Sequence, residues 1–144
     1  MQLQDVMTPA VEVIAPEASI YEAAEKMSHR DIGPLPVCDG ERVVGLLTDR
    51  DITVRAVAAG RDPRMTHVRD IMTPDVVYGF EDQAVEDAAR LMAQYQIRRL
   101  PVLNRSKQLV GMVALGDLAV HAGTRPVAAE VLEQVSEPGT SGRT

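Results

Sequence analysis

Apolar residues recur at helical spacing in two segments of the chain. The first stripe follows Ser19, which can cap a helix, and the second follows the acidic pair Glu81–Asp82, which favours the positive end of a helix dipole. We therefore predict two amphipathic helices, beginning at these residues. The stripes are Ile20, Ala23, Ala24 and Met27, and Val85, Ala88, Ala89 and Met92.

Each of these helices is followed by two short apolar runs with a polar turn between them. Leu35–Cys38 and Val43–Leu47 flank the turn at Asp39–Arg42. The corresponding turn later in the chain is Asn104–Gln108. Both patterns are typical of an antiparallel hairpin.

A short strand before each amphipathic helix and a further helix after each hairpin complete the pattern. Val11–Ile14 and Val76–Tyr78 are apolar runs that follow Met-Thr-Pro, and the residue before a proline favours extended backbone. We expect later helices at Asp49–Gly60 and Gly116–Gly123, each ended by a glycine. Pro126–Gln134 is expected to add one more helix.

The order of these elements occurs twice. Asp5–Pro9 recurs as Asp70–Pro74, and Leu35–Val37 recurs as Leu100–Val102. A half of about 60 residues is marginal alone, so the two halves are expected to pack through their sheets. The fold class is therefore α+β (α/β), with two β-α-β-β-α repeats. The expected division is 1–64 for repeat 1, 65–125 for repeat 2, and 126–144 for a C-terminal helix and frayed tail.

Composition and charge limit the environment and the partners. Apolar residues make up 45% of the 144 residues and aromatics only 3%, which predicts an aliphatic core. The formal net charge of −6 argues against binding to nucleic acid or to anionic membranes. No apolar run approaches the ~20 residues that cross a bilayer, and the single cysteine excludes an internal disulfide. A cytoplasmic location is expected.

Two corresponding segments end in an aspartate where a strand meets a helix. They are Gly45–Asp51, GLLTDRD, and Gly111–Asp117, GMVALGD. A carboxylate at such a corner can accept both hydroxyls of a ribose, and Thr48 can add a hydroxyl. The alternative is a capping box, in which Thr48 and Asp51 only satisfy the start of the helix. The second segment has alanine in place of that threonine, so a full box cannot explain Asp117. The helix dipole, which favours an acid in the first turn, still could.

An arginine pair precedes the second Leu-Pro-Val. Arg98 and Arg99 could bind phosphate, since a guanidinium forms forked hydrogen bonds with it. The alternative is that both are ordinary surface charges. The corresponding residues of the first repeat, Gly33–Pro34, are neutral, so the positive charge is uneven. Arg50 is a second phosphate candidate.

Three motifs, each present twice in the same order, resemble a pair of cystathionine-β-synthase (CBS) domains. They are Met-Thr-Pro before the first strand, Leu-Pro-Val in the second, and Gly-x-x-Thr-x-x-Asp at the third, with alanine in place of threonine in repeat 2. The resemblance extends to about residue 123 and is strongest to small stand-alone bacterial proteins of the hypoxic- or stress-response type. It implies pseudo-twofold symmetry, two clefts between the repeats, and a regulatory rather than catalytic role.

The resemblance also implies the ligand class and the residues that bind it. The ligand would be an adenosine-containing nucleotide: AMP, ADP, ATP, NAD or S-adenosylmethionine. Tyr78 could stack on the base, although a half-buried strand aromatic explains it equally well. The first cleft would comprise Thr8, Val13, Gly33, Pro34, Arg98, Arg99, Met112, Ala114 and Asp117. The second would comprise Leu46, Thr48, Arg50, Asp51, Thr73 and Tyr78.

Partners and rival functions follow from the same residues. The small residues Ala23–Ala24 and Ala88–Ala89 allow close helix packing, which suits a homodimer, and any output would pass through an unknown effector protein. We expect no catalytic residues, no required cofactor and no metal site, because Cys38 looks buried and the histidines, His29, His67 and His121, share no ligand spacing with it. The alternatives are a ligand-free dimeric scaffold and a zinc-binding stress-response protein.

Overall fold

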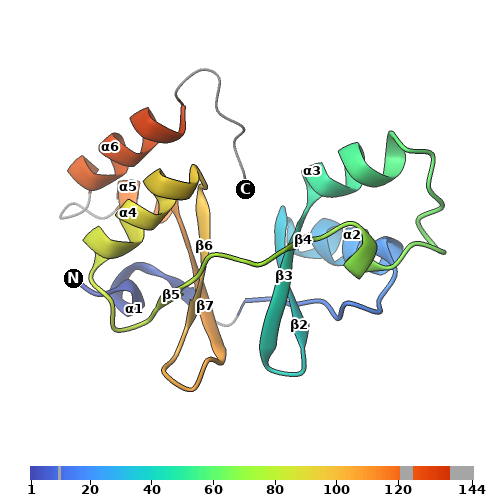
Figure 1. Ribbon diagram of the computed structural model, residues 1–144, viewed down its shortest axis with the longest axis horizontal. Coiled ribbons are helices and arrows are strands. Elements are labelled where there is room, and N and C mark those ends of the chain that lie inside the picture. Colours follow the sequence, from blue (N-terminus) through green and yellow to red (C-terminus); the bar gives the residue numbers. More distant parts are fainter. Residues whose placement is uncertain (10, 121–124, 137–144) are drawn as a thin grey trace. The chain divides into compact units, whose positions relative to one another are not determined.

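The computed structural model describes residues 1–9, 11–120 and 125–136. It contains two compact units (Figure 1). Unit 1 comprises Met1–Val11 and Val77–Thr144, and unit 2 comprises Glu12–Val76. Each unit therefore contains residues from both sequence repeats. The repeat boundaries at residues 64 and 125 divide the sequence differently and stay a prediction.

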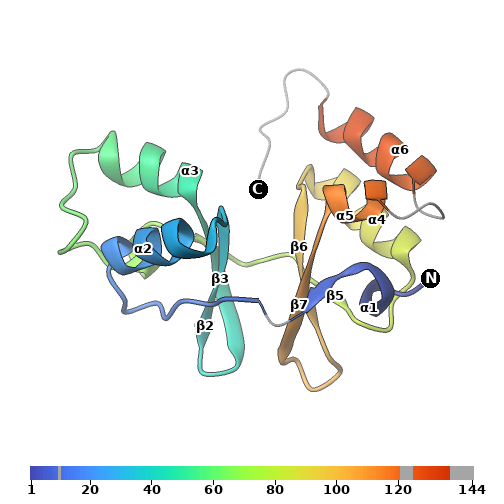
Figure 2. The same ribbon diagram turned by 180° about the vertical axis from the view of Figure 1, so that it is seen from behind.

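Unit 2 has a three-stranded sheet in the order β2-β3-β4, and α2 packs on β2 (Figure 2). The Ser19 hydroxyl caps α2 by accepting a hydrogen bond from Glu22 N at 3.1 Å. The strands are β2 (Pro34–Asp39), β3 (Arg42–Thr48) and β4 (Thr73–Pro74). The helices are α2 (Ile20–Arg30), α3 (Asp49–Asp51), the π-helix η1 (Ile52–Val57) and the 3-10 helix η2 (Val68–Asp70).

Unit 1 has a four-stranded sheet in the order β1-β7-β6-β5. Its last helix, α6, packs on both α4 and α5. The strands are β1 (Thr8–Pro9), β5 (Gly79–Phe80), β6 (Arg99–Leu103) and β7 (Leu109–Ala114). The helices are α1 (Leu3–Val6), α4 (Val85–Tyr95), α5 (Leu115–Val120) and α6 (Arg125–Val135).

The two Met-Thr-Pro segments exchange between the repeats. In unit 1, Thr8 from the first repeat pairs with Met112 on β7. In unit 2, Thr73 from the second repeat pairs with Leu46 on β3. Each hairpin thus gains its neighbouring strand from the other repeat.

The buried residues follow the same exchange. Leu3 and Val6, at the start of the chain, are buried in the core of unit 1 together with Leu100 and Val113. Val68 and Ile71, which occupy the corresponding positions in the second repeat, are buried in the core of unit 2. A short helix and a two-residue strand therefore link each sequence repeat to the core formed mainly by the other.

Most of the expected elements are confirmed. Both hairpins form, with registers centred on Pro36↔Leu46 and Pro101↔Met112. The amphipathic helices are α2 and α4, and α6 matches the helix expected at Pro126–Gln134. The tail at 137–144 lies outside the described residues.

The first strand of each repeat was predicted in the wrong place. The Val11–Ile14 run contains only an isolated bridge, from Ile14 to Val37. The strand expected at Val76–Tyr78 begins later, at Gly79–Phe80, which pairs with β6 in parallel. The position of the first strand is set by its backbone pairing with the following hairpin and not by the apolar run that precedes it.

The helix ends also differ from expectation. Residues 81–83 form a turn, in which Gln83 Oε1 accepts the hydrogen bond of Phe80 N at 2.7 Å, and Ala84 bridges to Gln2 before α4 starts at Val85. The helix expected at Asp49–Gly60 is a short α3 that continues as a π-helix. Gly60 ends it with φ +72°, as a terminating glycine should. The terminator expected at Gly123 lies outside the described residues.

The alanine pair on α4 does not form a free helix face. Ala88 and Ala89 are buried in the core of unit 1, and α6 of the same chain contributes Ala128 and Val131 to that core. The small residues therefore allow close packing of α6 and do not present a surface for a second copy. On α2 the corresponding pair is split, with Ala23 buried and Ala24 exposed.

Candidate ligand-binding sites

The strand-to-helix corner of unit 2 contains a full capping box. Thr48 Oγ1 accepts from Asp51 N at 3.1 Å, and Thr48 N donates to Asp51 Oδ2 at 3.0 Å. Thr48 is 1% exposed, so the box satisfies a buried polar residue. Thr48 and Asp51 therefore do cap the helix, and this does not prevent the carboxylate from binding a ligand as well.

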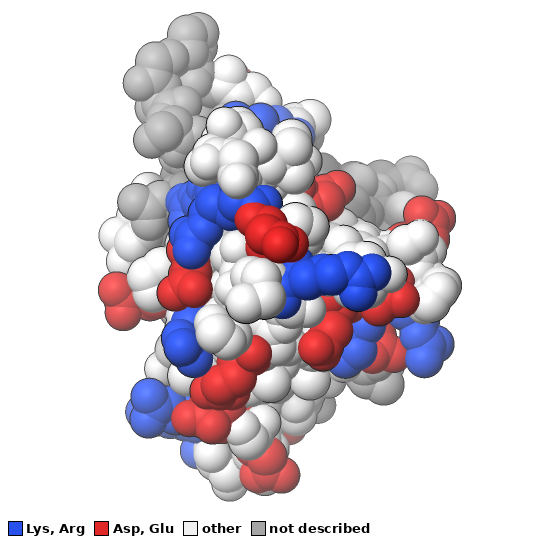
Figure 3. Space-filling model, turned by 90° about the vertical axis from the view of Figure 1, so that its right-hand side faces the viewer, with Lys and Arg blue, Asp and Glu red and all other residues white. Residues whose placement is uncertain are grey.

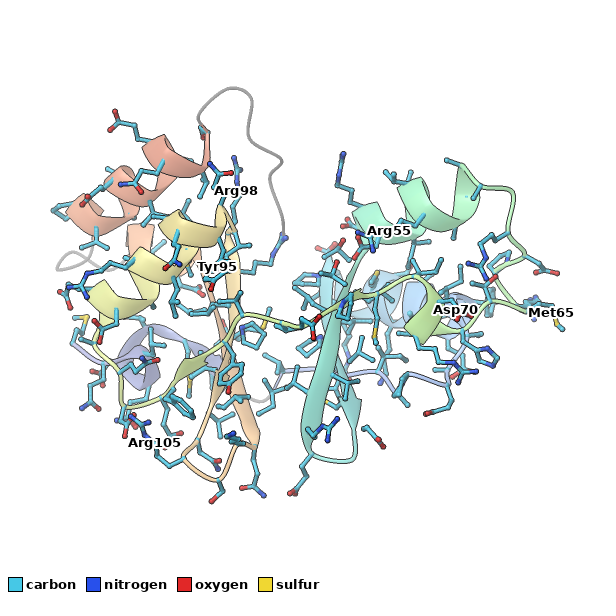
Figure 4. The ribbon with its side chains drawn as sticks, in the orientation of Figure 1. Arg55, Met65, Asp70, Tyr95, Arg98 and Arg105 are labelled. Carbon is cyan, nitrogen blue, oxygen red and sulfur yellow. The ribbon has the colours of Figure 1, made fainter. Side chains whose placement is uncertain are left out.

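Arg55 extends this corner towards the strand exchanged from the second repeat (Figure 4). Its Nε lies 3.8 Å from Asp51 Oδ1, and Nη1 donates to the carbonyls of Ile71 and Met72 at 3.2 and 3.4 Å. These carbonyls directly precede β4. The guanidinium therefore connects the corner carboxylate to the backbone that leads into Thr73.

The corner of unit 1 retains half of the capping box. Asp117 Oδ2 accepts from Ala114 N at 2.7 Å, and no hydroxyl is present at residue 114. Leu115 N donates to Arg98 O at 2.9 Å and joins the corner to the start of β6. The acid thus has the same backbone partner in both repeats, which explains why it stands without a threonine in the second.

The residues of each predicted site are divided between the two units. Thr8 and Met112 are paired in unit 1, which also contains Arg98, Arg99, Ala114 and Asp117. Val13, Gly33 and Pro34, expected at the same site, lie in unit 2. The other set is divided in the same way. Leu46, Thr48, Arg50, Asp51 and Thr73 lie in unit 2, whereas Tyr78 lies in unit 1.

A cavity of about 540 Å³ lies beside the corner of unit 1. Three of the predicted residues, Arg98, Arg99 and Ala114, form part of its lining. The remaining lining comes from Leu115, Gly116 and Ala119 at α5, and from Ala128, Ala129 and Leu132 on α6. Sequence reasoning missed the α6 residues. Their helical spacing predicts that α6 packs against something, but does not say against what.

Charge differs strongly between the two corners. Arg98 is exposed and Arg99 half-buried, and neither forms an ion pair with any residue in the described part of the chain. In unit 2 the corresponding position is Gly33, where an added Cβ would lie 3.3 Å from Asp49 Oδ1. The unit 1 corner therefore has two arginines beside one aspartate, whereas the unit 2 corner balances Asp49 and Asp51 with Arg50 and Arg55.

Tyr78 is a partly exposed aromatic next to β5. It is 36% exposed, and its ring meets Phe80 edge to face, with centroids 5.6 Å apart. Arg105 lies over the other ring at 4.3 Å and pairs with Asp82, and this hydrogen bond lowers the pKa of the Asp82 carboxyl. Tyr78 thus packs against Phe80 and still exposes part of its ring, and it lies just before β5 and not within a strand.

The remaining reactive residues form no cluster within the described ranges. Cys38 is buried as expected, and burial raises the pKa of its thiol. Among residues 1–9, 11–120 and 125–136, no three His, Cys, Asp or Glu side chains come together as a metal site would require. His121 lies outside these ranges. None of the described helices is long and apolar enough to cross a membrane.

The fold and the repeated corners define a tandem regulatory module with one exchanged strand in each sheet. The CBS-domain family model matches residues 3–57 and 68–122. The chain belongs to the CBS-domain family, and it contains two such domains, as its motifs predicted. The α6 helix lies outside both matches.

Relatives with similar sequences and structures agree with this assignment. The chain is 42% identical over 134 residues to the CBS domain-containing protein YhcV of Bacillus subtilis, covering 93% of this chain and 94% of that protein. The crystal structure of Hypoxic Response Protein I with two coordinated zinc ions has a TM-score of 0.76 and 33% identity, over 84% and 98% of the two chains. CBSX2 in complex with AMP has a TM-score of 0.68 and 27% identity, over 92% and 96%.

Proposed function

We propose that this chain is a regulatory module that binds an adenosine-containing nucleotide between its repeats and responds by changing conformation or assembly. One observation carries the proposal. Thr8 on the exchanged strand pairs with Met112 on β7, the strand that leads into the corner with Asp117, and the cavity at that corner is lined by two arginines that form no ion pair among the described residues. The AMP complex of CBSX2 supports the ligand class. The module performs no chemistry of its own.

The residues of unit 1 suit the sugar and phosphate of such a ligand. Asp117 uses Oδ2 for the backbone, and a carboxylate has further lone pairs that can accept a ribose hydroxyl. Arg98 and Arg99 would bind the phosphates, because their guanidiniums have no carboxylate partner among the described residues. Val13, Gly33 and Pro34 stay the predicted apolar contacts of the adenine.

The corner of unit 2 is the weaker of the two proposed sites. Asp51 Oδ2 accepts a hydrogen bond from Thr48 N, and Oδ1 lies near Arg55, so less of its carboxylate is available for a sugar. Asp49 adds negative charge there, which disfavours phosphate. Of the two arginines at this corner, Arg55 is engaged with Asp51 and with the carbonyls of Ile71 and Met72, which leaves Arg50 as the phosphate candidate. Thr73, Leu46 and Tyr78 would supply the other contacts. We expect the Asp117 site to fill first.

A thermal-shift panel tests this proposal. We expect at least one of AMP, ADP, ATP, NAD and S-adenosylmethionine to stabilise the protein, by about 2.7 kcal/mol at 100 times its Kd. Asp117→Asn should greatly reduce that stabilisation, because it loses the charge of the sugar-binding carboxylate. The amide oxygen can still accept from Ala114 N, which preserves the cap. Asp51→Asn is the matched control and should have the smaller effect.

Two other outcomes would favour a rival function, and a third would remove the role of one residue. If no nucleotide raises the melting temperature at millimolar concentration, the protein acts as a dimeric scaffold. Equal stabilisation of wild type and Asp117→Asn would remove the assigned role of that residue. Stoichiometric zinc in the purified protein, with stabilisation by zinc alone, would support the stress-response alternative that the zinc-bound Hypoxic Response Protein I suggests.

We further propose that the module is a homodimer that uses helices of unit 2. Val54 and Val57 on the π-helix are 50% and 67% exposed, whereas α6 already covers the alanine pair of α4. Light scattering should give the mass of a dimer, and Val57→Lys should weaken dimerisation by at least tenfold. Val120→Lys is the control, at a valine of unit 1 that is 71% exposed. A monomeric wild type, or dissociation only with Val120→Lys, would contradict the proposed interface.

A further inference from the structure

The cavity of unit 1 differs from its surroundings in charge and in side-chain size. The chain has 21 acidic and 15 basic residues, yet the described residues that line this cavity include two arginines and no carboxylate. Asp117, the nearest acid in sequence to Gly116, directs Oδ2 to the backbone of Ala114 and does not line the cavity. An anion is therefore the ligand that the cavity favours.

The walls away from the arginines are apolar and lined mainly by small residues. Ala119, Ala128 and Ala129 leave a space that larger side chains would fill. A volume of about 540 Å³ lies in the range of small-molecule sites, which are mostly apolar with a few fixed polar groups. The arrangement suits a ligand with an anionic end at Arg98 and Arg99 and an apolar body against α6.

Two neighbouring stripes of α6 have different roles. Ala128, Val131 and Val135 are buried in the core of unit 1 and fix the helix on α4 and α5. Ala129 and Leu132, one position further round, line the cavity, and Ala128 contributes to both the core and the cavity wall. Leu132 is 48% exposed, so ligand contact would cover apolar surface that is now in water. A ligand that contacts both α6 and the arginines must favour the state in which α6 is packed on α4 and α5.

We infer that α6, which lies outside both CBS-domain matches, forms a wall of the anion-binding site in unit 1, so that ligand binding and α6 docking are linked. The inference rests on the proposed function for the identity of the ligand. The role of α6 itself requires only that the ligand be an anion. Because linkage is reciprocal, the ligand stabilises α6 docking by the same factor by which docked α6 increases ligand affinity.

The test uses the full chain and two probes, ADP and inorganic pyrophosphate. Calorimetry should show that Ala129→Phe, which fills the cavity, weakens ADP binding by about tenfold or more. Glu133→Phe is the matched control, because Glu133 is exposed on the same helix and does not line the cavity. Amide resonances of residues 129 and 132 should shift when wild type binds ADP. If Ala129→Phe does not fold, Leu132→Ala is the deciding variant, and it should lower ADP affinity several-fold.

The outcomes separate this inference from the proposed function. Unchanged ADP affinity in folded Ala129→Phe or in Leu132→Ala would overturn the role of α6 and leave nucleotide binding intact. If wild type binds no nucleotide but pyrophosphate shifts the α6 amides, and Ala129→Phe removes that shift, the proposed function fails and the α6 site stands. If neither probe binds, both are wrong.

Discussion

Gly111→Ala is expected to lower the free energy of unfolding by about 2–3 kcal/mol, near the upper end for overpacking a well-packed site. A Cβ at this position would lie 2.8 Å from the carbonyl oxygen of Thr8 and 2.7 Å from Met7 Sδ. The methionine can rotate away, but the carbonyl belongs to β1, which pairs with β7 through Pro9 and Gly111. The substitution therefore forces the exchanged strand off the sheet. Urea denaturation measures the loss.

Gly116→Ala is the control for this substitution. Apart from its chain neighbours and the backbone of helix α5, no heavy atom of the described residues lies within 4 Å of a Cβ at Gly116, so alanine should be neutral or stabilise by up to about 1 kcal/mol. Gly45→Ala should resemble Gly111→Ala, because its Cβ would lie 3.0 Å from the carbonyl oxygen of Thr73. Stability equal to wild type in Gly111→Ala would show that β1 is not held closely against β7.

These glycines mark what the sequence could and could not predict about the fold. Helices α2 and α4 and both hairpins could be predicted, because their apolar residues follow a helical or an alternating period. Strand exchange could not be predicted, because a two-residue strand such as Thr8–Pro9 is too short to show an alternating apolar pattern. The glycine at the centre of the third strand was the available signal, since it indicates a close backbone approach.

The candidate site could be predicted to a similar extent. Asp51 and Asp117 stand out because they recur at a strand–helix corner, but sequence alone could not separate capping from ligand binding. The structure shows that the carboxylates cap, and this leaves sugar binding as a second possible use of the same group. The cavity wall formed by α6 could not be predicted at all, because only tertiary packing brings Ala129 and Leu132 to the same cavity as Arg98.

Leu100→Ala is expected to destabilise the protein by about 3 kcal/mol or more, as for other leucines truncated in a core. Leu100 on β6 is fully buried, and it shares that core with Leu3 and Val6. Leu3 N donates to Gln83 O at 2.9 Å, so its amide should be protected from hydrogen exchange. We expect the variant to accelerate exchange at Leu3 together with the amides of β6 and β7.

The corresponding substitution in unit 2 provides the control and completes the argument. Leu35→Ala should leave Leu3 protected and should instead expose the amide of Val68, which donates to Ala18 O at 2.8 Å. Val68 belongs to the second repeat in sequence, although it is buried in the unit built mainly from the first. If each substitution affected only residues of its own sequence repeat, the exchange of segments would be wrong. The joining of Thr8 to the Asp117 corner, on which the proposed nucleotide site depends, would then be wrong as well.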